Sequence, residues 1–381
     1  MTDPADGPRR AIAVLAPAGV YLGVRLIGIV VLAVMAARNG TSLLGELTSW
    51  DGEWLLGIAA HGYDGVSDRL VDVHGDRYPD TALAFLPGYP AAVAALAPLV
   101  GGNVVAAGLL VSLLAGIAAA YGLTRLGSIV PGGSRRAGLI LTGLFAAVPM
   151  GVTLSMAYSE ALFCALAIWA LVAVLEERWL TAGLFTALAG TVRPTVTGLI
   201  VAVGLAAVVA AVRRGAGVRA WLAVLLAPTG LLAYLAYVAW RTGEPAGWFR
   251  IQQQGWETSL DGGAAVAAYV LRTLGGSEQI HDLLSVASLI GAVVLFAVAL
   301  AMRLPWPLLV YGGVGLATVL GTDGVMNSKL RFLVSLFVLL LPPALGLSRR
   351  RTGTAVAVLV AAALVSAWIG GFALTVWRYG I

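Results

Sequence analysis

Long apolar runs recur along the whole chain and rule out an ordinary soluble fold. Hydrophobic residues make up 60% of the 381 residues and charged residues only 11%, whereas about 25% are charged in a typical soluble domain. A membrane-crossing helix needs roughly 20 apolar residues. We therefore predict an all-α, polytopic membrane protein with about 11 crossings in a single domain, residues 1–381. The expected spans are residues 11–37, 104–126, 137–152, 157–175, 179–194, 197–212, 220–240, 282–302, 305–321, 331–347 and 353–377.

The first run, residues 11–37, follows Arg9 and Arg10 as a secretory signal would, but it is too long for a signal's apolar region. We therefore expect it to be the first span. Cys164 is the only cysteine, which excludes a disulfide framework and a cysteine-based metal site. The net charge of +5 comes from arginines beside the spans, so it indicates a bilayer as partner and no nucleic acid.

Residues 82–100 decide the orientation of everything that follows them. This apolar stretch contains Pro87, Pro90 and Pro98, which break a regular span. If it does not cross and the N-terminus is cytoplasmic, every arginine cluster faces the cytoplasm, as the positive-inside rule requires. We therefore predict a re-entrant or interfacial helix over 82–100. The clusters are Arg9/Arg10, Arg125/Arg135/Arg136, Arg213/Arg214/Arg219 and Arg349–Arg351.

In this topology two long loops, residues 38–103 and 241–281, lie outside and hold most of the polar side chains. The cytoplasmic turns are short and basic. We therefore expect the chemistry on the extracytoplasmic face of the plasma membrane. The acidic residues of the first loop are Glu46, Asp51, Glu53, Asp64, Asp68, Asp72, Asp76 and Asp80.

The segment "LTSWDGEWLLGIAAHGYD", residues 47–64, concentrates polar and aromatic groups beside the first span. Thr48 with Asp51 fits a capping box, and Gly62 suits a helix end, so we predict a helix over about 49–61. Helical spacing places four side chains on one face of it, namely Trp50, Trp54, Ile58 and His61. An interfacial helix with a capping aspartate explains the pattern as well as a functional site does.

Asp51 and Glu53 stand two positions apart and point to opposite flanks of a helix. They would converge on a metal ion only in an extended segment. A metal site is therefore the weaker interpretation.

Several further motifs carry polar groups at the expected outer boundary. Glu160 is costly there unless it pairs, with Arg25 or Arg193, or faces water. Lys329 and Arg331, in "MNSKLRF", suit a lipid phosphate and equally suit simple anchoring. The other motifs are "AFLPGYP" with Tyr89, "SMAYSEALF" with Tyr158, "GTVRPTVTG" with Arg193, and "WFRIQQQGWETSLDGG" with Gln253 and Trp256.

The order of "WDGEWLLGIAAHGY", "AFLPGYP", "YSEALF", "TVRP", "QQGW" and "SKLRF" resembles the PIG-V-like mannosyltransferases, over residues 20–345. Bacterial relatives of that family occur in actinobacteria. The resemblance implies the GT-C fold, with an active site on the non-cytoplasmic face and a polyprenyl-phosphate sugar as donor. One departure is Ser49, which stands where relatives commonly have an arginine.

The same resemblance implies an inverting transfer of mannose from polyprenyl-phosphate-mannose to a lipid-linked or protein acceptor. Asp51 would be the general base, and no metal ion or other cofactor is required. Lys329, Arg331 and Arg193 would hold the donor phosphate. The side chains expected to contact the sugars are Trp50, Glu53, Trp54, His61, Tyr89, Tyr158, Glu160, Gln253 and Trp256.

Two other classes of function fit the same composition. A transporter or flippase of lipid-linked sugars would also be polytopic, although such proteins usually contain internal repeats and polar groups in mid-membrane. A non-catalytic subunit of an assembly complex for cell-envelope glycans would keep the fold without the reaction. The retention of Asp51, Lys329 and Arg331 favours the enzyme.

Overall fold

The computed structural model describes residues 6–276, 279–377 and 380, with side chains from residue 13 onward. Arg9 and Arg10 therefore lie outside the described side chains. The described chain is almost entirely helical, and its single β-bridge joins Leu260 to Thr322. The α-helices are α1 (Asp6–Arg38), α2 (Leu43–Thr48), α3 (Asp51–His61), α4 (Gly88–Leu96), α5 (Val104–Ile129), α6 (Arg135–Ala146), α7 (Glu160–Leu175), α8 (Trp179–Gly190), α9 (Thr197–Arg213), α10 (Gly217–Leu226), α11 (Thr229–Thr242), α12 (Gly247–Trp256), α13 (Ala264–Gly276), α14 (Ile280–Ala301), α15 (Trp306–Gly321), α16 (Lys329–Phe332), α17 (Leu341–Ser348) and α18 (Thr352–Thr375).

Short 3₁₀ turns connect or extend these helices at eight places. They are η1 (Tyr63–Gly65), η2 (Thr81–Ala84), η3 (Ala97–Val100), η4 (Gly151–Leu154), η5 (Pro194–Val196), η6 (Met326–Ser328), η7 (Leu333–Ser335) and η8 (Phe337–Leu340), counted over the described residues.

All the predicted spans contain helix, but fewer than 11 are long and apolar enough to cross a bilayer unaided. Within the described ranges six helices pass that test, or seven if the pair Met326–Ser335 and Phe337–Ser348, bent by 69°, forms one span. The six are Ala13–Arg38, Val104–Ile129, Pro194–Arg213, Gly217–Thr242, Ile280–Ala301 and Thr352–Thr375.

The remaining predicted spans form shorter helices. α7 has 16 residues and α8 has 12, which is below the roughly 20 residues that a straight crossing needs. The stretch 82–100 is divided between η2, α4 and η3, and a turn at residues 101–103 separates it from α5. Its proline-rich sequence thus gives short helical pieces, while its position relative to the bilayer stays a prediction.

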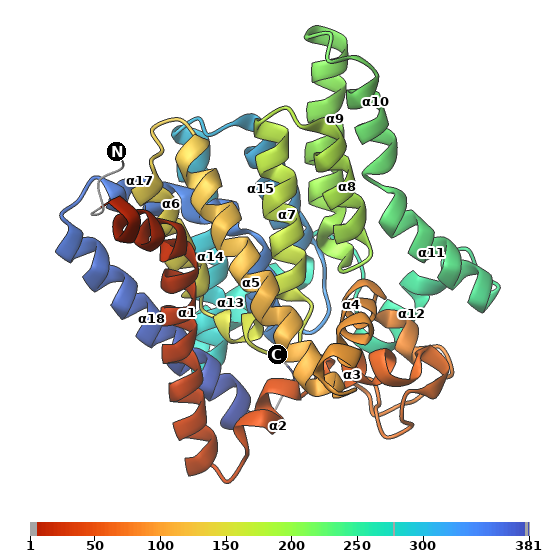
Figure 1. The fold of residues 1–381 in the computed structure, drawn as a ribbon. Coiled ribbons are helices and arrows are strands. Elements are labelled where there is room, and N and C mark those ends of the chain that lie inside the picture. Colours follow the sequence, from red (N-terminus) through yellow and green to blue (C-terminus); the bar gives the residue numbers. More distant parts are fainter. Residues whose placement is uncertain (1–5, 277–278, 378–379, 381) are drawn as a thin grey trace.

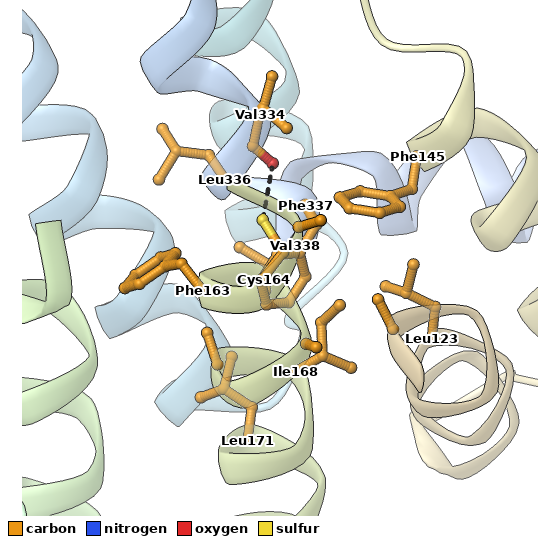
Figure 2. Packing of buried hydrophobic residues seen from close by; sticks show 14 of the residues in the cluster. Leu123, Phe145, Phe163, Cys164, Ile168, Leu171, Val334, Leu336, Phe337 and Val338 are labelled. Carbon is orange, nitrogen blue, oxygen red and sulfur yellow. Dashed lines mark hydrogen bonds between the residues drawn. The ribbon is translucent and has the colours of Figure 1, made fainter. Parts of the chain in front are cut away.

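The core packs α5, α6 and α7 against the broken segment before α17. Cys164, at the centre of Figure 2, is fully buried, and its thiol approaches the Val334 carbonyl oxygen at 3.8 Å. Phe145 and Phe337 pack in the same cluster. An apolar environment of this kind makes Cys164 a structural residue.

The two ends of the molecule differ in chemistry. Figure 1 shows α2, α3, α4 and α12 gathered at the lower end, opposite the turn between α9 and α10. At that opposite end Arg125 pairs with Glu176 at 2.6 Å and Arg214 with Glu177 at 2.8 Å, just beyond the C-terminus of α7. The arginine-rich turns and the motif-bearing loops are therefore separated by the length of α7.

Candidate active site

Asp51 is the first residue of α3 and directly follows the two-residue interruption, Ser49 and Trp50, that separates α3 from α2. Thr48 Oγ1 donates to the Leu44 and Gly45 carbonyls and so belongs to the end of α2. The predicted capping box is therefore wrong, because α3 begins at Asp51 after Trp50, which makes no side-chain capping bond. Trp50 takes a left-handed conformation, φ 56°, at this interruption, which a bulky side chain adopts only under constraint from its surroundings. Gly62 ends α3 as predicted.

A cavity of about 140 Å³ opens beside Asp51, and we call it the central cavity. Its walls come from the first loop, the start of α7, the turn before η5, α12 and the segment around α16. The polar residues that line it are Asp51, Ser159, Arg193, Gln252, Trp256, Thr258, Asp323, Ser328 and Arg331.

Four of the predicted site residues form one chain of charges at this cavity. Arg331 Nη1 donates to Asp51 Oδ2 at 2.6 Å, and Arg331 Nε lies 3.4 Å from Glu160 Oε1. The same carboxylate oxygen lies 2.5 Å from Arg193 Nη1. Glu160 is 2% exposed and Arg331 8%, so each charge depends on its partner, because an isolated buried charge is very costly. The expected pairing of Glu160 with Arg193 is confirmed.

Aromatic rings enclose this network. Tyr158 is fully buried, and its hydroxyl accepts the Asp51 backbone N–H at 3.2 Å, which fixes the start of α3. The Arg331 guanidinium lies 5.5 Å from the ring centroids of both Tyr158 and Phe332. Such cation–π contacts hold the guanidinium in place without using its N–H groups.

A second aromatic group forms the wall towards the loops. Phe85 stacks on Trp54 with ring centroids 5.3 Å apart and meets Trp256 edge-on at 5.5 Å. Arg77 covers the Trp54 ring at 5.0 Å. Of these, Phe85 and Trp256 line the central cavity, while Trp54 supports them from behind.

Close packing holds the α8–η5 turn against α4. The Gly88 N–H donates to the Thr191 carbonyl at 2.7 Å, and a Cβ on Gly88 would come within 2.8 Å of that oxygen. Glycine is therefore required for this approach. Leu86, two residues before Gly88, and Val192, which follows Thr191, both line the central cavity.

The loop after α3 is tied back to α11. Arg241 forms an ion pair with Asp64. The Arg241 guanidinium donates hydrogen bonds to this exposed carboxyl group and lowers its pKa. The contact fixes the first loop against the segment that leads into α12.

Only three of the twelve predicted substrate contacts line the central cavity, namely Arg193, Trp256 and Arg331. Trp54, Tyr158 and Glu160 lie behind its wall. Glu53, His61, Gln253 and Trp50 are exposed. Tyr89 is fully buried, and its hydroxyl bonds to the Gly108 carbonyl at 2.8 Å and to Ser112 at 3.0 Å. Tyr89 is therefore held as a packing residue between α4 and α5.

Lys329 is also turned away from the central cavity. Its Nζ donates to the carbonyls of Val319, Thr322 and Asp323 at 2.6–3.1 Å and to Thr322 Oγ1 at 2.8 Å. The side chain is 1% exposed. With all its donors directed at the end of α15, Lys329 caps that helix's carbonyl groups, and it does not point at the space beside Asp51.

Sequence reasoning missed Gln252 and Asp323. Gln252 lies one helical turn before Trp256, so i, i+4 spacing could have placed both on one face and left Gln253 outside. Gln252 Nε2 donates to the Ala84 carbonyl at 3.0 Å. Asp323 accepts a hydrogen bond from Ser259 Oγ at 2.9 Å, a pairing between distant segments that no local pattern signals.

The described residues contain no group of three or more His, Cys, Asp or Glu side chains placed to hold a metal ion. Arrangements of two carboxylates and two arginines nevertheless allow acid–base work and anion binding at one place. Independence from metal ions stays a prediction.

No protein-family model matches the sequence. Over 160 residues, 40% of the chain, it is 37% identical to GPI alpha-1,6-mannosyltransferase 2 of Mus musculus. It is 36% identical to the protein of the same name from Cricetulus griseus, also over 160 residues. The match spans 29% of the length of each of these relatives. The chain is thus similar, over less than half its length, to two mannosyltransferases.

Proposed function

We propose that the protein is a membrane mannosyltransferase that moves mannose from polyprenyl-phosphate-mannose to a glycolipid or protein acceptor. The observation that carries this proposal is the charge network at the central cavity, in which Asp51 meets Arg331 at 2.6 Å. The similarity to the two GPI mannosyltransferases supports the same reaction class.

Asp51 acts as the general base of an inverting transfer. Arg331 occupies Oδ2 of this carboxylate, so Oδ1 is the oxygen that accepts the proton of the attacking hydroxyl. The hydroxyl oxygen bonds to the anomeric carbon as the bond to the donor phosphate breaks, through an oxocarbenium-like transition state. One base is sufficient, since no covalent intermediate forms.

Arg331 and Arg193 hold the donor phosphate and stabilise the charge that develops on it. Both line the central cavity, and each has guanidinium N–H groups beyond those bonded to Asp51 and Glu160. Lys329, whose donors are directed at the end of α15, supports this site structurally and does not bind the phosphate.

Gln252, Asp323 and Trp256 position the sugars in this scheme. Gln252 lines the central cavity with a carboxamide group, Asp323 with a carboxylate and Trp256 with its indole ring. Glu160 keeps the two arginines oriented from behind, because its carboxylate is buried between them.

The arrangement in the membrane follows from the same proposal. The chain takes the GT-C fold with about 11 crossings, loops 38–103 and 241–281 face the outside of the plasma membrane, and 82–100 is a re-entrant or interfacial helix. Supporting this, the arginine–glutamate pairs lie at the end of α7 opposite the central cavity, and the positive-inside rule places such arginines in the cytoplasm. No metal ion is needed, because the arginines neutralise the leaving phosphate.

The test incubates the purified full chain with radiolabelled polyprenyl-phosphate-mannose, with and without a membrane lipid extract. A transferase forms labelled glycolipid or glycoprotein only when the acceptor is present. A flippase moves the labelled donor across a liposome bilayer without a new glycosidic bond, and a non-catalytic subunit does neither. Either of these last two results would reject the proposal.

A further inference from the structure

A second polar cavity, which we call the loop cavity, adjoins the central cavity. It measures about 160 Å³ and is built from residues 72–81 of the first loop and from α12. Trp256 lines both cavities. The other lining residues that bear on its chemistry are Asp72, Tyr78, Asp80, Arg250 and Gln254. None of these five has a part in the transfer reaction described above.

Asp72 carries an unsatisfied carboxylate oxygen in this cavity. The residue is 7% exposed, and its Oδ1 accepts the backbone N–H groups of His74 and Asp76, each at 2.9 Å. Its Oδ2 is buried and has no hydrogen-bond partner among the described residues. Buried polar atoms are nearly always hydrogen-bonded, so an oxygen left without a partner indicates a missing ligand or water.

The backbone around Asp72 is held rigidly, so the orphan oxygen is not a product of a loose loop. The Asp72 N–H donates to the Asp76 carbonyl at 2.9 Å, and the Val73 N–H donates to the Gly255 carbonyl at 3.2 Å. The second bond fixes the loop to α12 one residue before Trp256. The cavity is therefore a preformed site between two anchored segments.

The size and charge of the loop cavity select a neutral polar ligand. Its volume is about ten times what one water needs. Asp72 and Asp80 repel an anion, and Arg250 is already engaged by Glu244 at 2.6 Å and by Gln254 at 3.2 Å. Carboxylate and carboxamide oxygens beside a tryptophan ring match the hydroxyl groups and the apolar face of a sugar.

We propose that the loop cavity binds a sugar unit of the acceptor, next to the sugar whose hydroxyl is presented to Asp51. This inference rests on the proposed function and narrows the acceptor to one that carries at least two sugars. Asp72 Oδ2 accepts a hydroxyl hydrogen of that sugar, and Trp256, shared by both cavities, spans the two sugar positions.

The test measures equilibrium binding to the full chain in detergent, using n-octyl α-mannoside and n-octyl α-mannobioside as probes. We expect the disaccharide to bind about 10-fold more tightly or better, as a hydrogen bond to a charged group provides. Asp72→Asn should remove most of that preference and leave monosaccharide affinity unchanged. Asparagine keeps an oxygen for the His74 and Asp76 N–H groups, so the turn stays folded.

Asp76→Asn is the matched control, because Asp76 lies in the same loop but is exposed and does not line the cavity. It should keep the wild-type preference, and Gln254→Ala should reduce it. Equal affinity of the wild type for both probes would overturn the inference, as would an unchanged preference in Asp72→Asn. A preference abolished by EDTA would also overturn it, because the cavity would then hold a cation.

Binding without turnover separates this inference from the proposed function. Asp51→Asn protein should retain the disaccharide preference although it does not transfer mannose. If the wild type shows the preference but forms no product, the transferase proposal fails and the sugar site stands. If product forms without any preference, the sugar site fails and the transferase proposal stands.

Discussion

The two ends of α7 hold the same kinds of ion pair in opposite environments. Arg331 and Glu160 at the central cavity are 8% and 2% exposed, whereas Arg214 and Glu177 at the other end are 64% and 58% exposed. The exposed pair is solvated and contributes little, while the buried pair has lost its hydration and depends on mutual contact.

That difference separates charges that anchor a membrane protein from charges that perform chemistry. The charge of an arginine at the end of a span is solvated by water or lipid headgroups, so replacing that arginine costs little stability. Buried, paired charges seldom stabilise a protein as well as apolar residues would. Their presence beside a polar cavity therefore indicates a site whose function requires them.

Removal of Arg331 should give the largest effect on stability. Arg331→Ala leaves Asp51 and the buried Glu160 without this partner, so we expect the free energy of unfolding to fall by about 3–5 kcal/mol. Thermal unfolding of the purified protein in detergent measures this change. Glu160→Gln in the same background should restore part of the loss by removing a buried charge. A loss below about 0.5 kcal/mol, in the range of exposed pairs, would break the comparison.

Lys329→Met should have an intermediate effect and distinguish a structural cation from a substrate-binding one. The change leaves the carbonyls of Val319, Thr322 and Asp323 without their shared donor, and we expect a loss of about 1–3 kcal/mol. The KM for the donor should stay unchanged, in contrast to Arg193→Ala, which should raise it. A raised donor KM in well-folded Lys329→Met protein would show that this lysine binds the donor phosphate.

Arg214→Ala should give the smallest effect. The pair that it removes is exposed on both sides, so the free energy of unfolding should change by no more than about 0.5 kcal/mol. Transfer activity should equal that of the wild type. A loss comparable to that of Arg331→Ala would show that burial does not separate the two ends of α7.

Sequence patterns predicted the helices well because apolar runs are visible directly in the order of the residues. They did not predict how many helices reach full span length, since the ends of α6, α7 and α8 depend on packing in the folded chain. Short motifs also located Asp51, Glu160, Arg193 and Arg331, which lie far apart in sequence but meet at one network.

The direction of individual side chains was harder to predict. Lys329 and Arg331 stand two residues apart in one motif, yet one reaches back to the α15 carbonyls and the other reaches Asp51. The sequence motif predicts Gln253 as a substrate contact, whereas Gln252 faces the cavity. The register of α12 is set by its contact with η2, which no local pattern signals. The interruption between α2 and α3 at Trp50 could not be predicted from the residue type, since only the surrounding fold can hold a tryptophan at positive φ.

The most direct test of the account is the turnover of Asp51→Asn protein with polyprenyl-phosphate-mannose and the membrane lipid extract. Asparagine preserves the size of the side chain and an oxygen for Arg331, so the fold should survive. If Asp51 is the general base, turnover should fall by roughly 10²–10⁴. Near-wild-type mannose transfer by folded Asp51→Asn protein would contradict the central claim.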